Sequence, residues 1–251
     1  MGKIVAIVNQ KGGVGKTTTC INLTIALHNA GKLVLLCDFD PQANATSGMG
    51  VDKLTVRGIY EVLIEGLDVH TAIAHTRYGD VLPSSKVLAG AGIEMIDRDG
   101  REFLLRGALA PIRDDYDFIL IDCPPSLELL TLNALCAAQS LLVPVQSEYF
   151  ALEGLSDLMN TVRIVRRKLN PALKLEGVLL TMFDGRTNLA LQVAEEVKRF
   201  FPGQVYASVI PRNIRLSEAP SHGKPIDAYD RFCRGAEAYR AFAAEFLRQN
   251  E

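Results

Sequence analysis

A run of glycines and lysines near the amino terminus has the composition of a phosphate-binding loop. Residues 9–18 read N-Q-K-G-G-V-G-K-T-T and end in the G-K-T of the pattern G-x-x-x-x-G-K-[ST]. Glycines lack a Cβ, so the backbone can curl and point its N–H groups at an anion. We expect Lys16 to reach the β- and γ-phosphates of a nucleotide and the Thr17 hydroxyl to bind Mg²⁺. The expected nucleotide-binding residues here are Lys11, Gly12, Gly13, Val14, Gly15, Lys16, Thr17 and Thr18.

Three aspartates stand at the ends of apolar segments that read as strands. Asp122 ends the segment 118–122, and Asp38 and Asp40 follow the segment 33–37. Ligands of open parallel sheets bind at the carboxyl ends of the strands, so these carboxylates are expected beside the loop. Asp38 and Asp40 point the same way in an extended chain, so one could support the metal and the other orient an attacking water. Taken singly, each aspartate is equally typical of a helix cap or a turn.

Apolar segments alternate with amphipathic segments along the chain, and these elements must position the loop and the aspartates. Strands are expected at 3–8, 33–37, 118–122, 141–145, 175–181 and 205–210. Helices are expected near 17–30, 101–113, 128–138, 152–169, 188–200 and 234–248. This alternation predicts a single α/β domain over residues 1–251, a P-loop NTPase with a mostly parallel twisted sheet and helices on both faces. The segment 45–100 is the least periodic, and we expect mobile loops there.

The composition is that of an ordinary globular protein, with 48% hydrophobic and 22% charged residues and a net charge of −2. Any contact with nucleic acid must therefore come from a local basic patch. Residues 160–251 carry 15 Lys and Arg against 10 Asp and Glu, a net charge of +5, which indicates either chance or a basic face.

No leader or anchor is expected from the sequence. No apolar run approaches the roughly 18 residues of a membrane span, and the amino terminus enters a strand directly, without a signal peptide. The five cysteines form no C-x-x-C pair and are typical of small buried side chains in a reducing cytosol.

Several motifs together resemble the ParA/MinD superfamily of deviant Walker-A ATPases. The loop lacks the first glycine of the common pattern and carries Lys11 ahead of its glycines. The motifs that carry the resemblance are KGGVGKTT (11–18), DFDPQAN (38–44) and IDCPPS (121–126). The chromosomal ParA, or Soj, branch is indicated by TMFDGRTNLA (181–190) and IPRNIRLSEAPSHGKPI (210–226). The resemblance extends over essentially the whole chain.

The resemblance implies an ATP sandwich between two subunits. Lys11 is similar to the signature lysine of the family, which reaches across the dimer to the partner's nucleotide. Gly12 would lie at that interface, where a side chain would clash. A lysine supplied in trans would make the complete site conditional on dimerisation, as an arginine finger does. Lys11, Lys16 and Asp40 are then the expected catalytic residues.

The resemblance also assigns roles around the nucleotide. Asp40 matches the carboxylate that positions the hydrolytic water, whereas Asp38 and Asp122 match the acids of the metal shell, with Thr17 as a metal ligand. ATP and Mg²⁺ are the implied cofactors. The remaining expected nucleotide contacts are Pro211 and Asn213 at the adenine, with Met182 nearby.

Members of the superfamily have different outputs, so the loop alone does not decide the function. Arg186 and Arg215 resemble the arginines with which the Soj branch binds DNA phosphates nonspecifically. MinD relatives bind membranes through a C-terminal amphipathic helix, but 234–248 lacks the expected lysine excess, so a docked core helix is favoured. Iron-protein relatives hold a cluster with interfacial cysteines, but Cys123 and Cys136 lie in apolar segments that do not favour this output.

The resemblance thus favours a cytoplasmic, nucleoid-associated ATPase of chromosome or plasmid segregation. A homodimer would coat double-stranded DNA, and a centromere-binding partner resembling ParB would stimulate its slow hydrolysis and release it. A MinD-like positioning ATPase on a membrane is the alternative, although no membrane contact is expected. A plasmid protein with an added N-terminal DNA-reading domain is not expected, because the chain begins at the strand before the loop.

Overall fold

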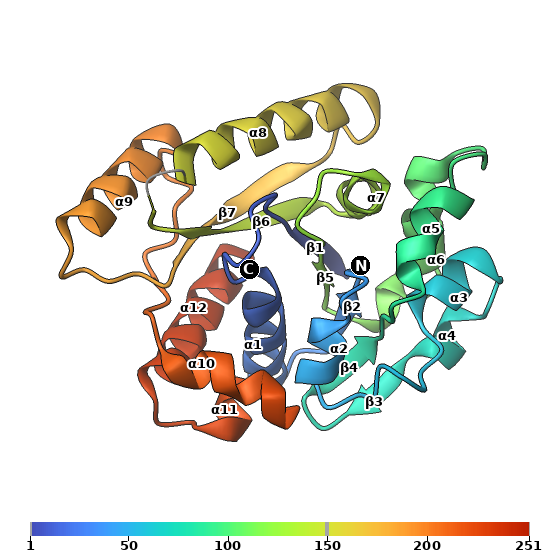
Figure 1. The fold of residues 1–251 in the computed structure, drawn as a ribbon, viewed down its shortest axis with the longest axis horizontal. Coiled ribbons are helices and arrows are strands. Elements are labelled where there is room, and N and C mark those ends of the chain that lie inside the picture. The colour runs from blue at the N-terminus through green and yellow to red at the C-terminus, as the bar shows by residue number, and fades with distance from the viewer. Residues whose placement is uncertain (1, 149–150, 251) are drawn as a thin grey trace.

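A seven-stranded sheet forms the centre of the protein (Figure 1). The computed structural model describes residues 2–148 and 151–250. The strands are β1 (Lys3–Ile7), β2 (Val34–Asp38), β3 (Ala74–Thr76), β4 (Gly79–Leu82), β5 (Phe118–Asp122), β6 (Ser140–Gln146) and β7 (Lys174–Thr181). Their order is β3-β4-β2-β5-β1-β6-β7. All neighbouring pairs are parallel except the antiparallel pair β3–β4 at one edge, so the predicted mostly parallel α/β sheet is confirmed.

Helices cover both faces of this sheet (Figure 1). The α-helices are α1 (Lys16–Asn29), α2 (Asn44–Gly48), α3 (Ile59–Ile64), α4 (Val69–Ala72), α5 (Leu88–Glu94), α6 (Leu104–Leu109), α7 (Leu129–Ala137), α8 (Ala151–Lys168), α9 (Asn188–Phe200), α10 (Ile214–Glu218), α11 (Ile226–Tyr229) and α12 (Arg234–Asn250). Short 3-10 turns at Arg101–Phe103, Arg113–Asp115 and Ala219–His222 complete the connections.

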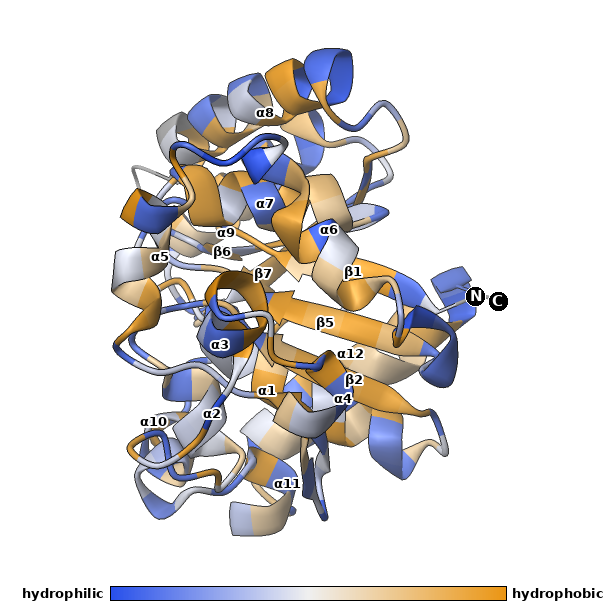
Figure 2. Ribbon diagram, turned by 90° about the vertical axis from the view of Figure 1, so that its right-hand side faces the viewer, coloured by the Kyte–Doolittle hydropathy of each residue, from blue (hydrophilic) through white to orange (hydrophobic). Residues whose placement is uncertain are grey.

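Two apolar cores hold the layers together. On one face, Leu23 of α1 and Phe242 of α12 belong to the same buried cluster as Leu120 of β5. On the other face, Leu135 of α7 and Leu158 of α8 join a cluster that includes the alternate residues of the strands. In Figure 2, β1, β5 and β2 are hydrophobic along most of their length. Burial on both faces explains why these strands read as unbroken apolar runs.

The register of the central strands places the predicted chemistry at one edge. Asp38, the last residue of β2, lies opposite Asp122, the last residue of β5. Ile7, the last residue of β1, lies opposite Asp122 on its other side. The glycine-rich loop follows β1 directly, so the loop and both carboxylates meet at the carboxyl ends of three adjacent strands, as expected for an open parallel sheet.

The predicted strand at 205–210 is wrong. This segment runs beside β7, where the Tyr206 and Ile210 N–H groups donate to carbonyls of β7, but it forms only an isolated bridge there. The N–H groups of Ala207 and Ser208 donate instead to the Glu245 carboxylate of α12, at 2.7 and 2.8 Å. A side chain thus replaces the strand partner in the middle of the segment.

Two other expectations need correction. The segment 45–100, expected as loops, folds into short helices and the strands β3 and β4, which extend the sheet beyond β2. Its elements are too short, three residues in β3 and seven in α5, to show a period in the sequence. The helix expected at 101–113 is the shorter α6, which ends at Leu109, two residues before Pro111. Proline has no backbone N–H, so Pro111 cannot donate the hydrogen bond that would continue the helix.

Candidate nucleotide-binding site

The loop between β1 and α1 curls through two glycines in the left-handed region. Gly13 has a φ of 76° and Gly15 a φ of 89°, values that a Cβ disfavours. α1 begins at Lys16, directly after this turn. The first N–H groups of a helix have no partners within it, so they offer the loop an anion-binding end. Thr181, at the end of β7, fixes the loop by donating a 2.7 Å hydrogen bond to the Val14 carbonyl.

A cavity of about 680 Å³ opens beside this loop. Sites for small ligands commonly have volumes of roughly 300–1,000 Å³. Ten residues predicted from the sequence lie in its wall: Gly12, Gly13, Gly15, Lys16, Thr17, Thr18, Asp40, Met182, Pro211 and Asn213. Val14 is buried, as are Asp38 and Asp122. The fold therefore gathers residues separated by about 200 positions into one site.

The Lys16 ammonium folds back over the loop. Its Nζ donates a 3.1 Å hydrogen bond to the Lys11 carbonyl, and the residue is only 6% exposed. Burial lowers the pKa of Lys16, while the negative charge of Asp122 opposes this shift. The ammonium thus lies within the curl of the loop and borders the cavity.

Asp122 is a buried carboxylate whose two oxygens have no hydrogen-bond partner in the described part of the chain. Burial raises the pKa of Asp122 well above its ordinary value, and the neighbouring Asp38 raises it further. The nearby Thr17 side chain lowers the pKa of Asp122 in part. Its hydroxyl nevertheless makes no hydrogen bond to either carboxylate oxygen of Asp122. An unpaired buried carboxylate is costly unless a cation or a donor compensates it.

Asp38 is equally buried, but it has partners. One oxygen accepts hydrogen bonds from the N–H and the hydroxyl of Thr46, both at 2.7 Å, and the other accepts from the Asp40 N–H at 3.3 Å. Burial raises the pKa of Asp38 to about 6, and the bonds from Thr46 limit the increase. Thr46 thereby fixes the side chain at the end of β2.

These groups fit a magnesium ion. The Thr17 hydroxyl and the carboxylates of Asp38 and Asp122 are hard oxygen donors, and the unpaired oxygens of Asp122 call for a cation. Among the residues described, no three His, Cys, Asp or Glu side chains are arranged to hold a metal by themselves. Mg²⁺ usually takes only one or two protein carboxylates and completes its shell with water and phosphate oxygens.

Asp40 borders the cavity on a rigid turn. One of its side-chain oxygens accepts a 2.9 Å hydrogen bond from the Gln42 N–H. Its carbonyl accepts a 2.8 Å hydrogen bond from the Ser84 hydroxyl. The residue is 8% exposed, so its carboxylate is held by the backbone in a largely buried position beside the loop.

Lys11 and Gly12 occupy the rim of the site. The Lys11 Nζ does not line the cavity but forms a 2.7 Å ion pair with Glu148, just beyond β6. A Cβ placed on Gly12 would meet no described atom nearer than the Pro125 Cβ, at 4.0 Å. Nothing described within the chain itself therefore requires a glycine at position 12.

Another part of the cavity wall comes from the residues that follow β7 and from the segment before α10. Met182 has a positive φ of 48°, rare for a residue with a Cβ, and the next residue forms an isolated bridge with Pro211. Asn213 is the N-cap of α10, because its Oδ1 accepts a 2.8 Å hydrogen bond from the Arg215 N–H. Met182, Pro211 and Asn213 line the cavity together with the loop.

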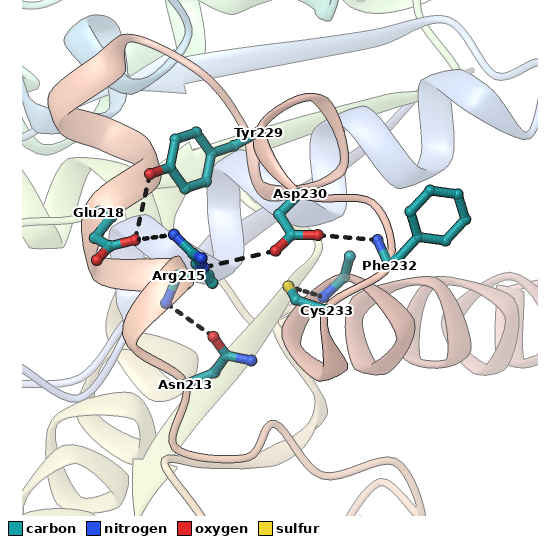
Figure 3. Close-up of polar contacts among 8 residues, drawn as sticks. Asn213, Arg215, Glu218, Tyr229, Asp230, Phe232 and Cys233 are labelled. Carbon is teal, nitrogen blue, oxygen red and sulfur yellow. Dashed lines mark hydrogen bonds and ion pairs between the residues drawn. The ribbon is translucent and has the colours of Figure 1, made fainter.

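The two arginines predicted to bind DNA lie outside the cavity wall. Arg186 is 89% exposed and forms a two-pronged ion pair with Asp184, at 2.8 and 2.7 Å. Figure 3 shows Arg215 between Glu218 and Asp230. Both guanidinium groups therefore reach the surface while remaining paired with carboxylates.

The chain is similar to known proteins along almost its whole length. A family model described as an AAA domain matches residues 2–175. The sporulation initiation inhibitor protein Soj of Bacillus subtilis is 57% identical over 248 residues, covering 98% of both chains. The chromosome partitioning protein ParA of Myxococcus xanthus is 52% identical, covering 100% of this chain and 89% of the relative. The chain belongs to the Soj/ParA family of chromosome-partitioning ATPases.

Solved structures share the architecture of this Soj/ParA family member. A Mycobacterium smegmatis protein described as cobyrinic acid a,c-diamide synthase, with a bound ATP analogue and magnesium, is 38% identical. It has a TM-score of 0.90 over 100% of this chain and 96% of that one. The cell division ATPase MinD of Pyrococcus furiosus is 30% identical, with a TM-score of 0.81 over 99% of both chains. The P-loop ATPase fold predicted from the motifs is therefore confirmed.

Sequence reasoning missed several residues of the Soj/ParA site. Thr181 ends a predicted strand, so the rule for the carboxyl ends of parallel strands could have found it. Tyr239 of α12 borders the cavity and shares a 3.1 Å hydrogen bond with Thr19 of α1, a contact across 220 positions that no local pattern signals. The other wall residues absent from the prediction are Gln42, Asn44, Pro125, Ile210, Arg212, Ile214, Leu216 and Ser217.

Proposed function

We propose that residues 1–251 act as one ATPase domain that dimerises on ATP, binds duplex DNA nonspecifically and drives chromosome or plasmid segregation. The observation that carries this proposal is the cavity bordered by Lys16, Thr17 and Asp40, with the unpaired carboxylate of Asp122 buried beside it. The magnesium and ATP analogue named for the Mycobacterium smegmatis structure support ATP and Mg²⁺ as the ligands.

In the proposed reaction, different residues of the site bind the phosphates, the Mg²⁺ ion, the attacking water and the adenine. Lys16 and the N–H groups of the loop bind the phosphates, and Thr17, Asp38 and Asp122 hold Mg²⁺. The bound ion would neutralise charge on the β- and γ-phosphates. Asp40 orients the water that attacks the γ-phosphate. Met182, Pro211 and Asn213 contact the adenine.

The proposed dimer is a nucleotide sandwich. Lys16 already occupies the curl of the loop, so Lys11 is free to act in trans once it leaves Glu148. Gly12 keeps the rim open for the second subunit. Dimerisation then depends on the γ-phosphate, because ATP binds the dimer in preference to the monomer.

Nonspecific contact with DNA phosphates is the proposed output. Arg186 and Arg215 are accessible, and residues 160–251 carry a net charge of +5. Such contacts give affinity without sequence readout and weaken steeply with salt. A centromere-binding protein of the ParB type is the proposed partner; it stimulates slow hydrolysis and so releases the dimer from the nucleoid.

The membrane alternative is less well supported. The apolar stripe of α12 is buried in the core, where Tyr239, Phe242 and Phe246 are each at most 2% exposed. A helix that lies on a membrane would instead need that face. Within the described ranges 2–148 and 151–250, no helix has the length and apolar composition needed to cross a bilayer.

Retention of a random-sequence DNA duplex tests the proposed function. The protein is assayed with ATP, with ADP and without nucleotide, each at two salt concentrations, with Lys16→Ala as the control. We expect retention only with ATP, falling steeply at the higher salt, and none for Lys16→Ala. Absence of DNA retention in every state of a folded, ATP-binding protein would contradict the DNA output, and vesicles would be tested next.

A further inference from the structure

Arg215 lies between two carboxylates that come from different elements (Figure 3). Its Nη1 donates a 3.0 Å hydrogen bond to Glu218 Oε2, one turn further along α10. Its Nε lies 3.6 Å from Asp230 Oδ2, at the end of α11. The charge of this group of three side chains is −1, although Arg215 is the residue expected to attract DNA.

Other contacts hold the two carboxylates in place. The Tyr229 hydroxyl donates a 3.3 Å hydrogen bond to the same Glu218 oxygen that accepts from Arg215. The Phe232 N–H donates a 3.3 Å hydrogen bond to the other oxygen of Asp230. The backbone N–H of Arg215 is bound in turn by the Asn213 cap. Both acids are therefore positioned around the guanidinium rather than sampling solvent freely.

A DNA phosphate that approaches Arg215 must compete with the carboxylates of Glu218 and Asp230 for the N–H groups of the guanidinium. The guanidinium binds carboxylates and phosphates through the same N–H groups, so a phosphate must displace Glu218 or share donors with it. The carboxylates also repel the phosphate directly. Arg215 is half exposed, and the Glu218 and Asp230 side chains are 38% and 33% exposed, so all three charges can be reached from solvent.

We propose that Glu218 and Asp230 form an acidic clamp on Arg215 that lowers the affinity of the protein for DNA. The proposal rests on the proposed DNA-binding function and adds its regulation: the clamp keeps each phosphate contact weak enough for the protein to be released. Arg186 is paired in a similar way, because its guanidinium donates hydrogen bonds of 2.8 and 2.7 Å to the two oxygens of Asp184.

The clamp can be removed without damage to the core. Exposed ion pairs contribute little to stability, and neither acid lies in the cavity wall. Glu218→Gln and Asp230→Asn keep the shape and most hydrogen-bonding atoms of the side chains while removing the charge. The matched control is Glu65→Gln, which removes a carboxylate from an exposed 2.8 Å pair with Arg57 beside α3, far from α10 in Figure 1.

The experiment measures the affinity for a random-sequence duplex with ATP at low salt, by fluorescence anisotropy. We expect roughly two- to five-fold tighter binding for each clamp variant, the scale of one exposed ion pair, and no change for Glu65→Gln. In an Arg215→Ala background the clamp substitutions should lose most of their effect. Thermal unfolding and ATP binding should match the wild type in every variant.

Three results would overturn the proposal. If the wild-type protein binds DNA and the clamp variants bind it equally tightly, the clamp proposal is wrong and the proposed function is unaffected. An equal gain from Glu65→Gln assigns the effect to net charge alone. Failure of the wild-type protein to bind DNA in any nucleotide state overturns the proposed function and the clamp with it.

Discussion

The glycines of the loop differ in what they require of the backbone. Gly13 and Gly15 adopt positive φ values, whereas Gly12 does not and has room for a Cβ. We therefore expect Gly12→Val to fold normally and to bind nucleotide, because its bulk projects from the rim. The same substitution should reduce the ATP-dependent dimer at least about tenfold, since a buried clash in an interface costs more than 1.4 kcal/mol.

Size-exclusion chromatography with ATP measures that loss. Gly13→Val is the control for strain: a positive φ penalises a β-branched residue by about 1–2 kcal/mol, so this variant should unfold at lower denaturant concentration. A Gly12→Val protein that elutes as a normal ATP dimer would exclude Gly12 from the interface.

Thr46 stabilises the buried carboxylate of Asp38 by donating hydrogen bonds to it. Its hydroxyl donates to Asp38 at 2.7 Å and accepts from the buried Ser84 N–H at 2.9 Å. Thr46→Val should therefore cost about 2–4 kcal/mol of the free energy of unfolding, because a carboxylate and an N–H both lose a partner. Urea denaturation measures this cost. Thr55→Val, at an exposed Thr–Asp contact, should stay within about 0.5 kcal/mol of the wild type.

At the scale of elements, Glu245 is what holds the segment 205–210 beside β7. Burial tends to raise the pKa of Glu245, but hydrogen bonds from Ser208 and Ala207 outweigh it and lower the pKa below its ordinary value. A lowered folded-state pKa gives stability that is present above the unfolded pKa and is lost as the pH falls through the folded value. Glu245→Gln should therefore cost about 1–3 kcal/mol at neutral pH.

The pH dependence distinguishes this charge effect from simple loss of packing. The difference between wild type and Glu245→Gln should shrink as the pH falls below the ordinary pKa of about 4.5, and it should be lost as the pH passes through the lower pKa of the folded state. Glu237→Gln, an exposed site on the same helix, should show no such difference at any pH. A constant gap between the two proteins across the titration would contradict the assignment.

The same elements show why some features could be predicted from the sequence and others could not. The loop at 11–17 and the strand ending in Asp122 are local patterns, and the parallel sheet brings them together by a general rule. The segment 205–210 has the composition of a strand, but Glu245, some 37 positions away, takes its N–H groups. Thr46 and Tyr239 are likewise defined by tertiary contacts, which leave no period or motif in the sequence.

At the scale of the molecule, α12 is part of the core rather than an appendage. Phe242 packs edge-on against Tyr206 at 4.8 Å between ring centroids and is fully buried. Phe242→Ala should lower the free energy of unfolding by about 3–5 kcal/mol, as large cavities do. Urea denaturation measures the change, and Phe232→Ala, at a residue 84% exposed, is the matched control with almost no expected effect.

The core position of α12 also bears on the membrane alternative. Exposing its apolar face would require breaking the same contacts, so the folded protein should not pellet with anionic vesicles with or without ATP. ATP-dependent co-sedimentation of a protein that keeps its wild-type unfolding midpoint would contradict this expectation and favour a membrane output.

The unpaired carboxylate of Asp122 lowers the stability of the fold when no ligand is bound. Folding buries the Asp122 carboxyl group without a hydrogen-bond partner, which reduces the free energy of unfolding. A cation bound at the end of β5 would offset this cost. Ligands that bind only the folded state raise its stability. Magnesium with nucleotide should therefore raise the unfolding temperature, whereas Asp122→Asn should raise it without ligand and blunt that response. Asp122 thus lowers the stability of the ligand-free fold while it provides an oxygen donor for the proposed metal site.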